Sequence, residues 1–241
     1  MYHWRTSVGP VDLAFTDRHG GASAAPYDEL NLAIEGGDDP ATTAANLRRV
    51  ADDFAPGAAV ADMRQVHGTV VDVVEDRGTP DRPEADALLT GEADLLLVVR
   101  VADCLPVLLA DPDAGVVGAV HAGRLGLAAG VAPAAVARMR DLGAERLTAW
   151  LGPRICGACY EVPAQMQAEV GAMVPEAVAT TSWGTPSLDI GAGVGAQLAQ
   201  LGVEVLDVGT CTRESTHLYS YRRDGTRAGR FAGLVRRRSH G

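Results

Sequence analysis

The sequence predicts a mixed α/β fold, or α+β, in a single domain, and three observations support this. The 241 residues are 47% hydrophobic and 22% charged, which is the composition of a globular protein. Short apolar runs of strand length alternate with longer segments that have helix boundary signals. Because no linker-like or repetitive tract separates two composition regimes, residues 1–241 are predicted to form one domain.

The expected strands are apolar runs too short to be buried helices. They are Val11–Thr16, Val60–His67, Thr69–Val74, Leu95–Val101, Leu105–Ala110, Val116–Val120, Leu147–Leu151, Ser187–Ile190 and Val203–Val208. The turn residues Asp111–Gly115 predict a hairpin between two of these strands, and Asp76–Glu84 is predicted to be a surface loop. Several runs are apolar on both faces, which is typical of sheets covered by helices.

Boundary residues mark the expected helices. Asp39 and Pro40 suit the cap and the first position of a helix. A glycine-bearing loop at Ala122–Gly126 is predicted to lead into a helix that reaches Leu142 and is kinked, or begins, at Pro133. Further helices are expected at Pro163–Met173 and Gly191–Leu201.

The charge balance and the apolar runs exclude several classes of partner. The chain has 21 basic and 31 acidic residues, a net charge of −10, so nucleic acid is not an expected partner. Every basic residue is arginine, and Schiff-base chemistry on lysine is therefore excluded. No apolar run reaches the ~18 residues that span a membrane. Four cysteines without a visible secretion signal indicate a cytoplasmic location.

Three metal-binding side chains are predicted to meet near the open end of the hairpin. Cys104 lies nine residues before a turn centred near Asp113 and His121 lies eight after it, so the two are expected to be cross-strand neighbours. His67, between two other expected strands, offers a second imidazole. Two His and one Cys suit a zinc ion that keeps its fourth position for water or substrate. The alternative interpretation is a small buried thiol and histidines satisfied by the backbone.

Ten short motifs along the chain resemble those of one known family. They are Arg18–Ser23, Tyr27–Leu32, Gly37–Pro40, Gln65–Gly68, Ala85–Thr90, Ala102–Val107, Val120–Gly123, Leu151–Pro153, Cys159–Val162 and Tyr219–Gly225. Over nearly the whole chain they resemble the laccase-domain, or multicopper polyphenol oxidoreductase, family, now regarded as purine nucleoside phosphorylases. In that family the motifs QVHG, ADC and VHAG supply one zinc site, which corresponds here to His67, Cys104 and His121.

The resemblance also implies a fold and an activity. The fold would be a four-layer α/β/β/α sandwich similar to the deamidase domain of cytotoxic necrotizing factors. The activity would be zinc-dependent phosphorolysis of adenosine, inosine and methylthioadenosine, with adenosine deamination as a second reaction and copper as an in vitro alternative metal. A purine nucleoside and phosphate are the expected partners, and a monomer is favoured. For some members, the resemblance implies removal of wrongly loaded amino acids from cell-wall precursors.

The chain departs from the family pattern at two places. The family sequence VHAGWRG is replaced by VHAGRLG at residues 120–126, so the arginine, Arg124, stands one place earlier. The family commonly has adjacent cysteines before Tyr-Glu-Val, whereas here Cys159 is preceded by Cys156 in a C-x-x-C arrangement. Because no partner pair is evident, we interpret Cys156 and Cys159 as buried or incidental thiols in preference to a redox site or a second metal site.

Other residues are assigned roles around the predicted zinc site. Asp103, which precedes Cys104, is expected either to transfer a proton or to orient a ligand histidine. The loop Gly123–Gly126 leads into a helix and carries Arg124, so it is predicted to bind phosphate. The residues expected to line the substrate pocket are Asn31, Arg64 and Arg222.

Two other functional classes stay open, and one is disfavoured. Cys104 as nucleophile and His121 as base would make a hydrolase or amidase that edits peptidoglycan precursors. A non-enzymatic metal-binding protein is the other. The extra His67 favours a metal, since a thiolate–imidazole pair needs only one histidine. Six scattered histidines with one cluster cannot build a multicopper laccase. The H-x-E and P-C-x-x-C signature of nucleoside deaminases is absent from the sequence.

Overall fold

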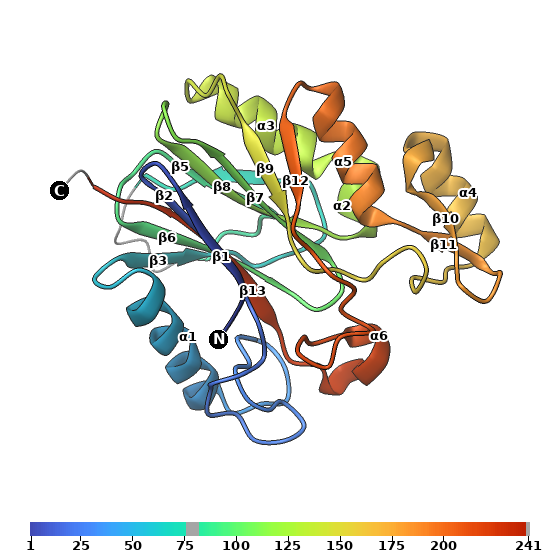
Figure 1. Ribbon diagram of the computed structural model, residues 1–241, viewed down its shortest axis with the longest axis horizontal. Coiled ribbons are helices and arrows are strands. Elements are labelled where there is room, and N and C mark those ends of the chain that lie inside the picture. Colours follow the sequence, from blue (N-terminus) through green and yellow to red (C-terminus); the bar gives the residue numbers. More distant parts are fainter. Residues whose placement is uncertain (76–81, 240–241) are drawn as a thin grey trace.

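The computed structural model describes residues 1–75 and 82–239, and it stacks two sheets face to face between two layers of helices (Figure 1). The expectation of a surface loop at Asp76–Glu84 falls largely on residues 76–81, which lie outside the described residues. The four layers confirm the mixed α/β class and the predicted α/β/β/α order.

The first sheet has the order β1-β2-β13-β6-β3. Its strands are β1 (Tyr2–Val8), β2 (Val11–Thr16), β13 (Phe231–Arg237), β6 (Leu95–Val101) and β3 (Ala59–Asp62). The last strand of the chain therefore pairs with β2 and β6 in the middle of the sheet.

The second sheet has the order β12-β9-β7-β8-β5-β4. Its strands are β12 (Glu204–Asp207), β9 (Thr148–Leu151), β7 (Leu105–Asp111), β8 (Val116–Ala122), β5 (Ala87–Thr90) and β4 (Val71–Val73). A separate two-stranded ribbon joins β10 (Val178–Thr180) to β11 (Pro186–Leu188).

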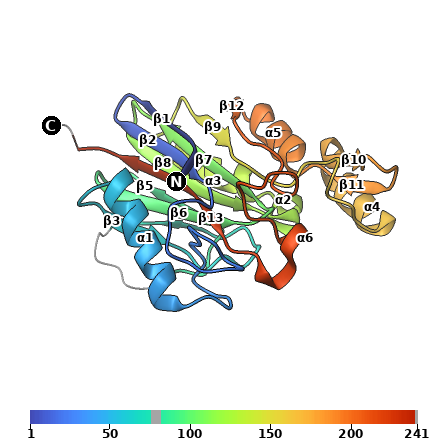
Figure 2. The same cartoon turned by 60° about the horizontal axis from the view of Figure 1, so that its bottom comes forward.

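Helices cover the outer faces of the two sheets (Figure 2). The helix α1 (Pro40–Phe54) packs on the first sheet, and its N-cap Asp39 accepts a hydrogen bond from the Thr42 N–H at 2.9 Å. The other helices are α2 (Arg124–Ala129), α3 (Val131–Asp141), α4 (Ala164–Met173), α5 (Ile190–Gln200) and α6 (Tyr221–Asp224), with 3₁₀ turns at Pro175–Ala177 and Gly225–Arg227.

Alternating side chains of the central strands fill two different cores. In β6, Leu96 and Val98 face α1, whereas Leu97 and Val99 pack between the sheets. In β7, Leu108 packs between the sheets. All seven residues of β6, β7 and β8 are buried. The continuous apolar runs in the sequence are therefore strands covered on both faces.

Several predicted boundaries are wrong, two of them by more than a few residues, and four strands were not predicted. The expected strand Val60–His67 ends at Asp62. Beyond it, Arg64 makes only an isolated bridge to Glu84, and the N–H groups of residues 66–68 bond to the Asp86 carboxylate instead of a neighbouring strand.

The expected helix up to Leu142 divides at Gly130, whose φ of +84° ends α2, so Pro133 lies inside the first turn of α3. The expected strand Ser187–Ile190 ends at Leu188, and Ile190 begins α5. The unpredicted strands are β1, β5, β10 and β13.

In the described part of the chain, no helix is long and apolar enough to cross a membrane.

Candidate metal centre and its cavity

The predicted hairpin is formed by β7 and β8, and it brings Cys104 close to His121. Pro106 pairs with His121 and Leu105 pairs with Ala122 across the hairpin. Cys104 lies one residue before β7, and His121 is the sixth residue of β8. The rigid part of the sheet therefore fixes the positions of both side chains.

His67 reaches the same point from the loop between β3 and β4. Its φ of +60° is unusual for a residue other than glycine. The Asp86 carboxylate holds this turn, accepting N–H hydrogen bonds from Val66 at 3.3 Å, His67 at 3.0 Å and Gly68 at 2.6 Å. These contacts stabilise the backbone conformation that directs His67 toward Cys104.

Asp86 also orients His121. The His121 Nδ1 atom lies 2.8 Å from Asp86 Oδ1, and both side chains are almost fully buried. Burial opposes the charge of Asp86, but His121 and the backbone donors keep the pKa of this carboxyl below its usual range. With Nδ1 engaged by Asp86, Nε2 is the His121 nitrogen available to a metal. Asp86 was not singled out from the sequence, although it lies in the quoted Ala85–Thr90 motif.

The three predicted ligands come together. One ligand atom from each of His67, Cys104 and His121 lies within 4.8 Å of the other two. Cys104 Sγ lies 3.9 Å from His67 Nε2, and the two imidazole rings meet edge to face with centroids 4.7 Å apart. Zinc bonds of about 2.0–2.3 Å to nitrogen and sulfur require donor separations of this order. The donor set, the spacing and the carboxylate behind His121 therefore fit a zinc ion.

Cys104 and His121 shift each other's pKa values toward a thiolate–imidazolium pair, and a metal that binds His121 Nε2 would displace the imidazolium proton. Burial would raise the pKa of the Cys104 thiol, but His121 and His67 lower it to about 6. Burial would lower the pKa of His121, but Cys104 and Asp86 raise it to about 9. The two histidines thus favour the thiolate of Cys104, which is both the metal-binding and the nucleophilic form of the side chain.

Gly123 leaves room for the ligands. A Cβ atom on this residue would lie 2.8 Å from His67 Cδ2 and 3.2 Å from Cys104 Sγ. The residue also caps the N-terminus of α2, which begins at Arg124. The glycine in the VHAG motif is therefore required by close approach of the two ligand side chains.

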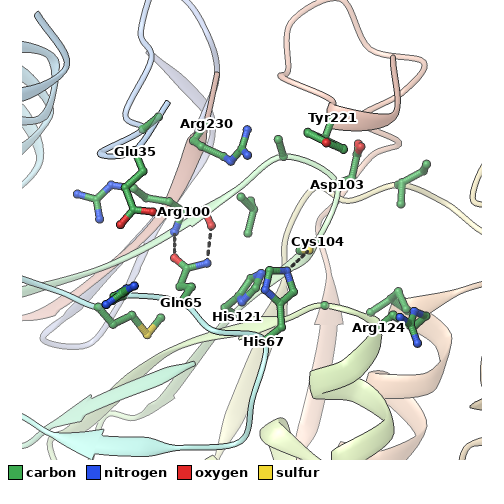
Figure 3. Close-up of a pocket in the computed structure, with 18 of the residues that line it drawn as sticks. Glu35, Gln65, His67, Arg100, Asp103, Cys104, His121, Arg124, Tyr221 and Arg230 are labelled. Carbon is green, nitrogen blue, oxygen red and sulfur yellow. Dashed lines mark hydrogen bonds between the residues drawn. The ribbon is translucent and has the colours of Figure 1, made fainter. Parts of the chain in front are cut away.

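The three ligands border a cavity of about 590 Å³ with cationic walls (Figure 3). In Figure 3 they lie between the Gln65–Arg100 pair and Arg124, with Tyr221 and Arg230 across the cavity. Its charged lining residues are Glu35, Asp103, Arg64, Arg82, Arg100, Arg124, Arg222 and Arg230, besides the ligands. Six arginines thus face two carboxylates, in a chain whose net charge is −10.

The predicted pocket residues differ in their placement. Arg64, Arg124 and Arg222 line the cavity. Arg64 is exposed and pairs with Glu84 at 2.9 Å. Arg222 donates to the Glu161 carbonyl at 2.9 Å, and its guanidinium lies 5.1 Å from the centroid of the Tyr160 ring.

Asn31 does not lie with the predicted pocket residues. Its side chain is fully buried and donates to Asp38 at 2.9 Å, while its Oδ1 accepts from Ala33 and Arg230 N–H groups. Asn31 is not among the residues that line the cavity. The structure therefore places it as a support beneath Arg230 instead of the expected substrate contact.

Asp103 lines the cavity, but its carboxylate is engaged in holding other segments. Its Oδ1 accepts from the Thr212 hydroxyl at 2.5 Å, and its Oδ2 accepts from the Arg222 N–H at 2.6 Å. The expectation that Asp103 orients a ligand histidine is wrong. Asp86, not Asp103, is the carboxylate that bonds to His121 Nδ1. Asp103 instead ties the Cys104 turn to the start of α6.

Comparison with known proteins gives one family and several close relatives. The model of the family described as multi-copper polyphenol oxidoreductase laccase matches residues 12–238. A Streptomyces coelicolor protein named purine nucleoside phosphorylase is 53% identical, with 98% of this chain and 99% of that protein covered. One of the same name from Corynebacterium glutamicum is 44% identical, covering 94% of each.

Solved structures have the same fold. A crystal structure of a Neisseria meningitidis protein superposes with a TM-score of 0.86 at 32% identity, covering 99% of this chain and 98% of that one. The YlmD protein of Geobacillus stearothermophilus superposes with a TM-score of 0.86 at 30% identity, covering 95% and 93%.

Proposed function

Because this chain belongs to the multi-copper polyphenol oxidoreductase laccase family, we propose that it is a zinc-dependent purine nucleoside phosphorylase. Its substrates would be adenosine, inosine and methylthioadenosine, with adenosine deamination as a second reaction. The names of the relatives support phosphorolysis. The observation that carries the proposal is the His67–Cys104–His121 group on the wall of an arginine-lined cavity.

Phosphate would be bound by arginines of this cavity. Arg124, Arg222 and Arg230 all line it, and guanidinium groups bind phosphate through paired, charge-assisted hydrogen bonds. The helix α2 has only six residues, so we assign phosphate binding to the Arg124 charge more than to the helix terminus. Although Arg124 stands one place earlier than the arginine of the family pattern, it still lines the cavity.

The purine would lie against the aromatic side of the cavity. Tyr160 and Tyr221 line it, and Tyr221 keeps 51% of its surface exposed, which leaves its ring accessible. An aromatic ring stacks on a purine without a demand for a particular base edge. This tolerance agrees with the range of nucleosides in the proposal.

Phosphorolysis breaks the bond between C1′ and the base nitrogen while a phosphate oxygen bonds to C1′. The arginines would hold the phosphate beside C1′, and the released base would take up the proton that the phosphate loses as its oxygen bonds to C1′. A zinc ion held by His67, Cys104 and His121 would supply Lewis acidity at the cavity wall. Asp86 would keep His121 in the tautomer that binds the ion.

Product analysis tests the proposal. The purified chain is incubated with each nucleoside, with and without phosphate, after its metal content has been measured. Free base and ribose 1-phosphate that form only with phosphate support it. Inosine formed from adenosine supports the second reaction. If a zinc-loaded protein leaves the nucleosides intact, the proposal is contradicted. If the active protein contains copper at full occupancy, the metal is copper and not zinc.

A hydrolase or amidase acting on peptidoglycan precursors is the second candidate, favoured by the low pKa of Cys104 beside His121. This activity would survive a chelator and be lost on alkylation of Cys104. The metal-dependent phosphorylase would be lost with the chelator and recovered with zinc. Amide cleavage of a muramyl precursor by the metal-free protein would favour the second candidate.

We further propose that the enzyme acts in the cytoplasm as a monomer. Light scattering coupled to size-exclusion chromatography tests the oligomeric state, with a mass near 25.0 kDa expected.

A further inference from the structure

A second group of metal-binding side chains lies apart from the hairpin. One ligand atom each from Cys156, Cys159, Cys211 and Glu214 lies within 4.8 Å of the others. Cys159 is 3% exposed, and its Sγ donates to Glu214 Oε1 at 3.6 Å. The four are not among the residues that line the cavity. This group, called the thiol cluster below, is therefore distinct from the centre already described.

Two turns with the same spacing build the thiol cluster. In the first turn, the Cys156 carbonyl accepts N–H hydrogen bonds from Cys159 and Tyr160, both at 3.0 Å. In the second, the Cys211 carbonyl accepts from the Ser215 N–H at 3.1 Å. Each turn directs two side chains, three residues apart, to the same point. The chain thus provides a C-x-x-C and a C-x-x-E arrangement, which is the paired-turn pattern of structural zinc sites with one sulfur replaced by a carboxylate.

Backbone hydrogen bonds hold the two turns together. The Arg154 N–H donates to the Thr210 carbonyl at 3.1 Å, and the Thr212 N–H donates to the Arg154 carbonyl at 2.9 Å. These bonds form a short parallel bridge between Arg154 and Cys211. The sulfurs are therefore brought together by the fold.

We propose that Cys156, Cys159, Cys211 and Glu214 bind a structural zinc ion. Three thiolates and one carboxylate complete the four ligands of a closed tetrahedral site, and thiolate ligands select zinc over magnesium or calcium. Binding releases the thiol protons to solvent and changes no oxidation state.

The alternative role for a C-x-x-C segment is thiol–disulfide exchange, and the surroundings argue against it. A redox pair needs only two sulfurs, and it would leave Cys211 and Glu214 without a role. Here a third sulfur and a carboxylate oxygen lie at the same point as the two sulfurs of the C-x-x-C segment. Four converging ligand atoms are the arrangement of a closed metal site.

The zinc ion would stabilise one wall of the catalytic cavity. Ile155 and Tyr160, which flank the first turn, both line that cavity. Thr212 in the second turn binds Asp103, beside Cys104. These segments lie between β9 and α4 and between β12 and α6, and the isolated bridge between Arg154 and Cys211 joins them without a regular strand pair. A metal crosslink would replace the missing secondary structure.

Metal counting on the full-length chain tests this proposal. We expect two zinc ions per chain in the wild type, one in His67→Ala/Cys104→Ser, and one in Cys156→Ser/Cys211→Ser. The control Ala158→Ser, at an exposed position in the first turn, should keep both ions. One zinc ion in the wild type that disappears with His67→Ala/Cys104→Ser would overturn the proposal.

Cobalt spectroscopy provides a readout that does not depend on the folding of the Cys156→Ser/Cys211→Ser variant. In His67→Ala/Cys104→Ser the thiol cluster is intact, so bound Co²⁺ should give the intense sulfur-to-cobalt charge transfer of three thiolates and tetrahedral d–d bands. An octahedral cobalt spectrum, an iron–sulfur spectrum of the purified chain, or a disulfide among these cysteines in protein purified without oxygen would overturn a zinc site.

Discussion

The group of His67, Cys104 and His121, called the hairpin centre below, and the thiol cluster both place cysteine beside other ligands, but they are built differently. The hairpin centre places His121 on a strand and Cys104 at a strand end, with Asp86 behind the histidines, and it faces the cavity. The thiol cluster stands on two turns and supplies four ligands. Three ligands beside a cavity suit chemistry, whereas four ligands on loops suit crosslinking. The number of ligands and their access to substrate distinguish the two roles more clearly than cysteine content does.

The largest expected difference between the two groups is thiol reactivity in metal-stripped protein. Iodoacetamide should modify Cys104 about 100- to 1,000-fold faster than Cys156 at pH 7, because their pKa values of about 6 and about 12 outweigh the lower nucleophilicity of the more acidic thiol. The Cys104 rate should rise with pH, with a midpoint near 6, as the thiolate forms. Peptide mapping measures both rates, and a Cys104 midpoint near 8.5 would contradict the described charge pair.

Removal of a hairpin ligand should abolish catalysis without emptying the thiol cluster. His121→Ala is expected to lower kcat/KM for phosphorolysis by about 100-fold or more, since even residues that support a ligand are worth 10–100-fold. The zinc content should fall by one ion. The control is His19→Ala, a histidine outside the cavity that pairs with His217. Unchanged turnover in His121→Ala would mean that this centre is not catalytic.

Asp86→Asn should weaken zinc binding at the hairpin centre by about 10- to 100-fold, because an amide cannot replace a carboxylate that serves His121 and three N–H groups. Asp111→Asn is the matched control. Asp111 is a buried carboxylate at the other end of the hairpin that also accepts backbone N–H bonds. The Asp111→Asn variant should lose about 1–3 kcal/mol of folding stability and keep the zinc affinity of the hairpin centre. Equal zinc affinities in the two variants would refute the orienting role of Asp86.

Gly123→Ala should lower kcat/KM by about tenfold, because the added methyl displaces His67 and Cys104, and a small misplacement of catalytic groups is costly. Gly91→Ala is the control, since a Cβ there meets nothing within 4 Å. Steady-state kinetics and thermal unfolding of both variants separate a local effect from a loss of stability. Equal kinetics in both would show that the ligands have room to move.

The smallest effect is expected for an arginine at the cavity rim. Arg64→Ala should raise the KM for phosphate by no more than about threefold, because this exposed side chain already pairs with Glu84 and exposed pairs are weak. Arg124→Ala should raise it by about tenfold, the value of one hydrogen bond to a charged group. A larger increase in the KM for phosphate in Arg64→Ala than in Arg124→Ala would show that phosphate binds nearer the cavity rim.

The sequence predicts the long apolar strands better than short strands and the strands at the two ends of the chain. The runs of β6, β7 and β8 are buried on both faces, so their apolar character alone marks them. In contrast, β1 is half-exposed and β5 has only four residues. The pairing of β13 with β2 and β6 joins the ends of the chain, which no local pattern reveals.

The hairpin centre was predictable where local geometry determines it. The turn at Asp111–Gly115 fixes the approach of Cys104 to His121. A lone Asp86 carries no such signal, because its partners lie 18–20 and 35 residues away. The thiol cluster was missed because the partner of its C-x-x-C segment begins at Cys211 and ends in a glutamate.

Asp86 bonds to the His121 ring and to the backbone N–H of His67 in the metal-free protein. The imidazoles therefore lose their conformational freedom when the polypeptide folds, and ion uptake has little further ordering to impose. Apo and loaded forms should consequently share one backbone, and exchange of one transition metal for another should proceed without unfolding.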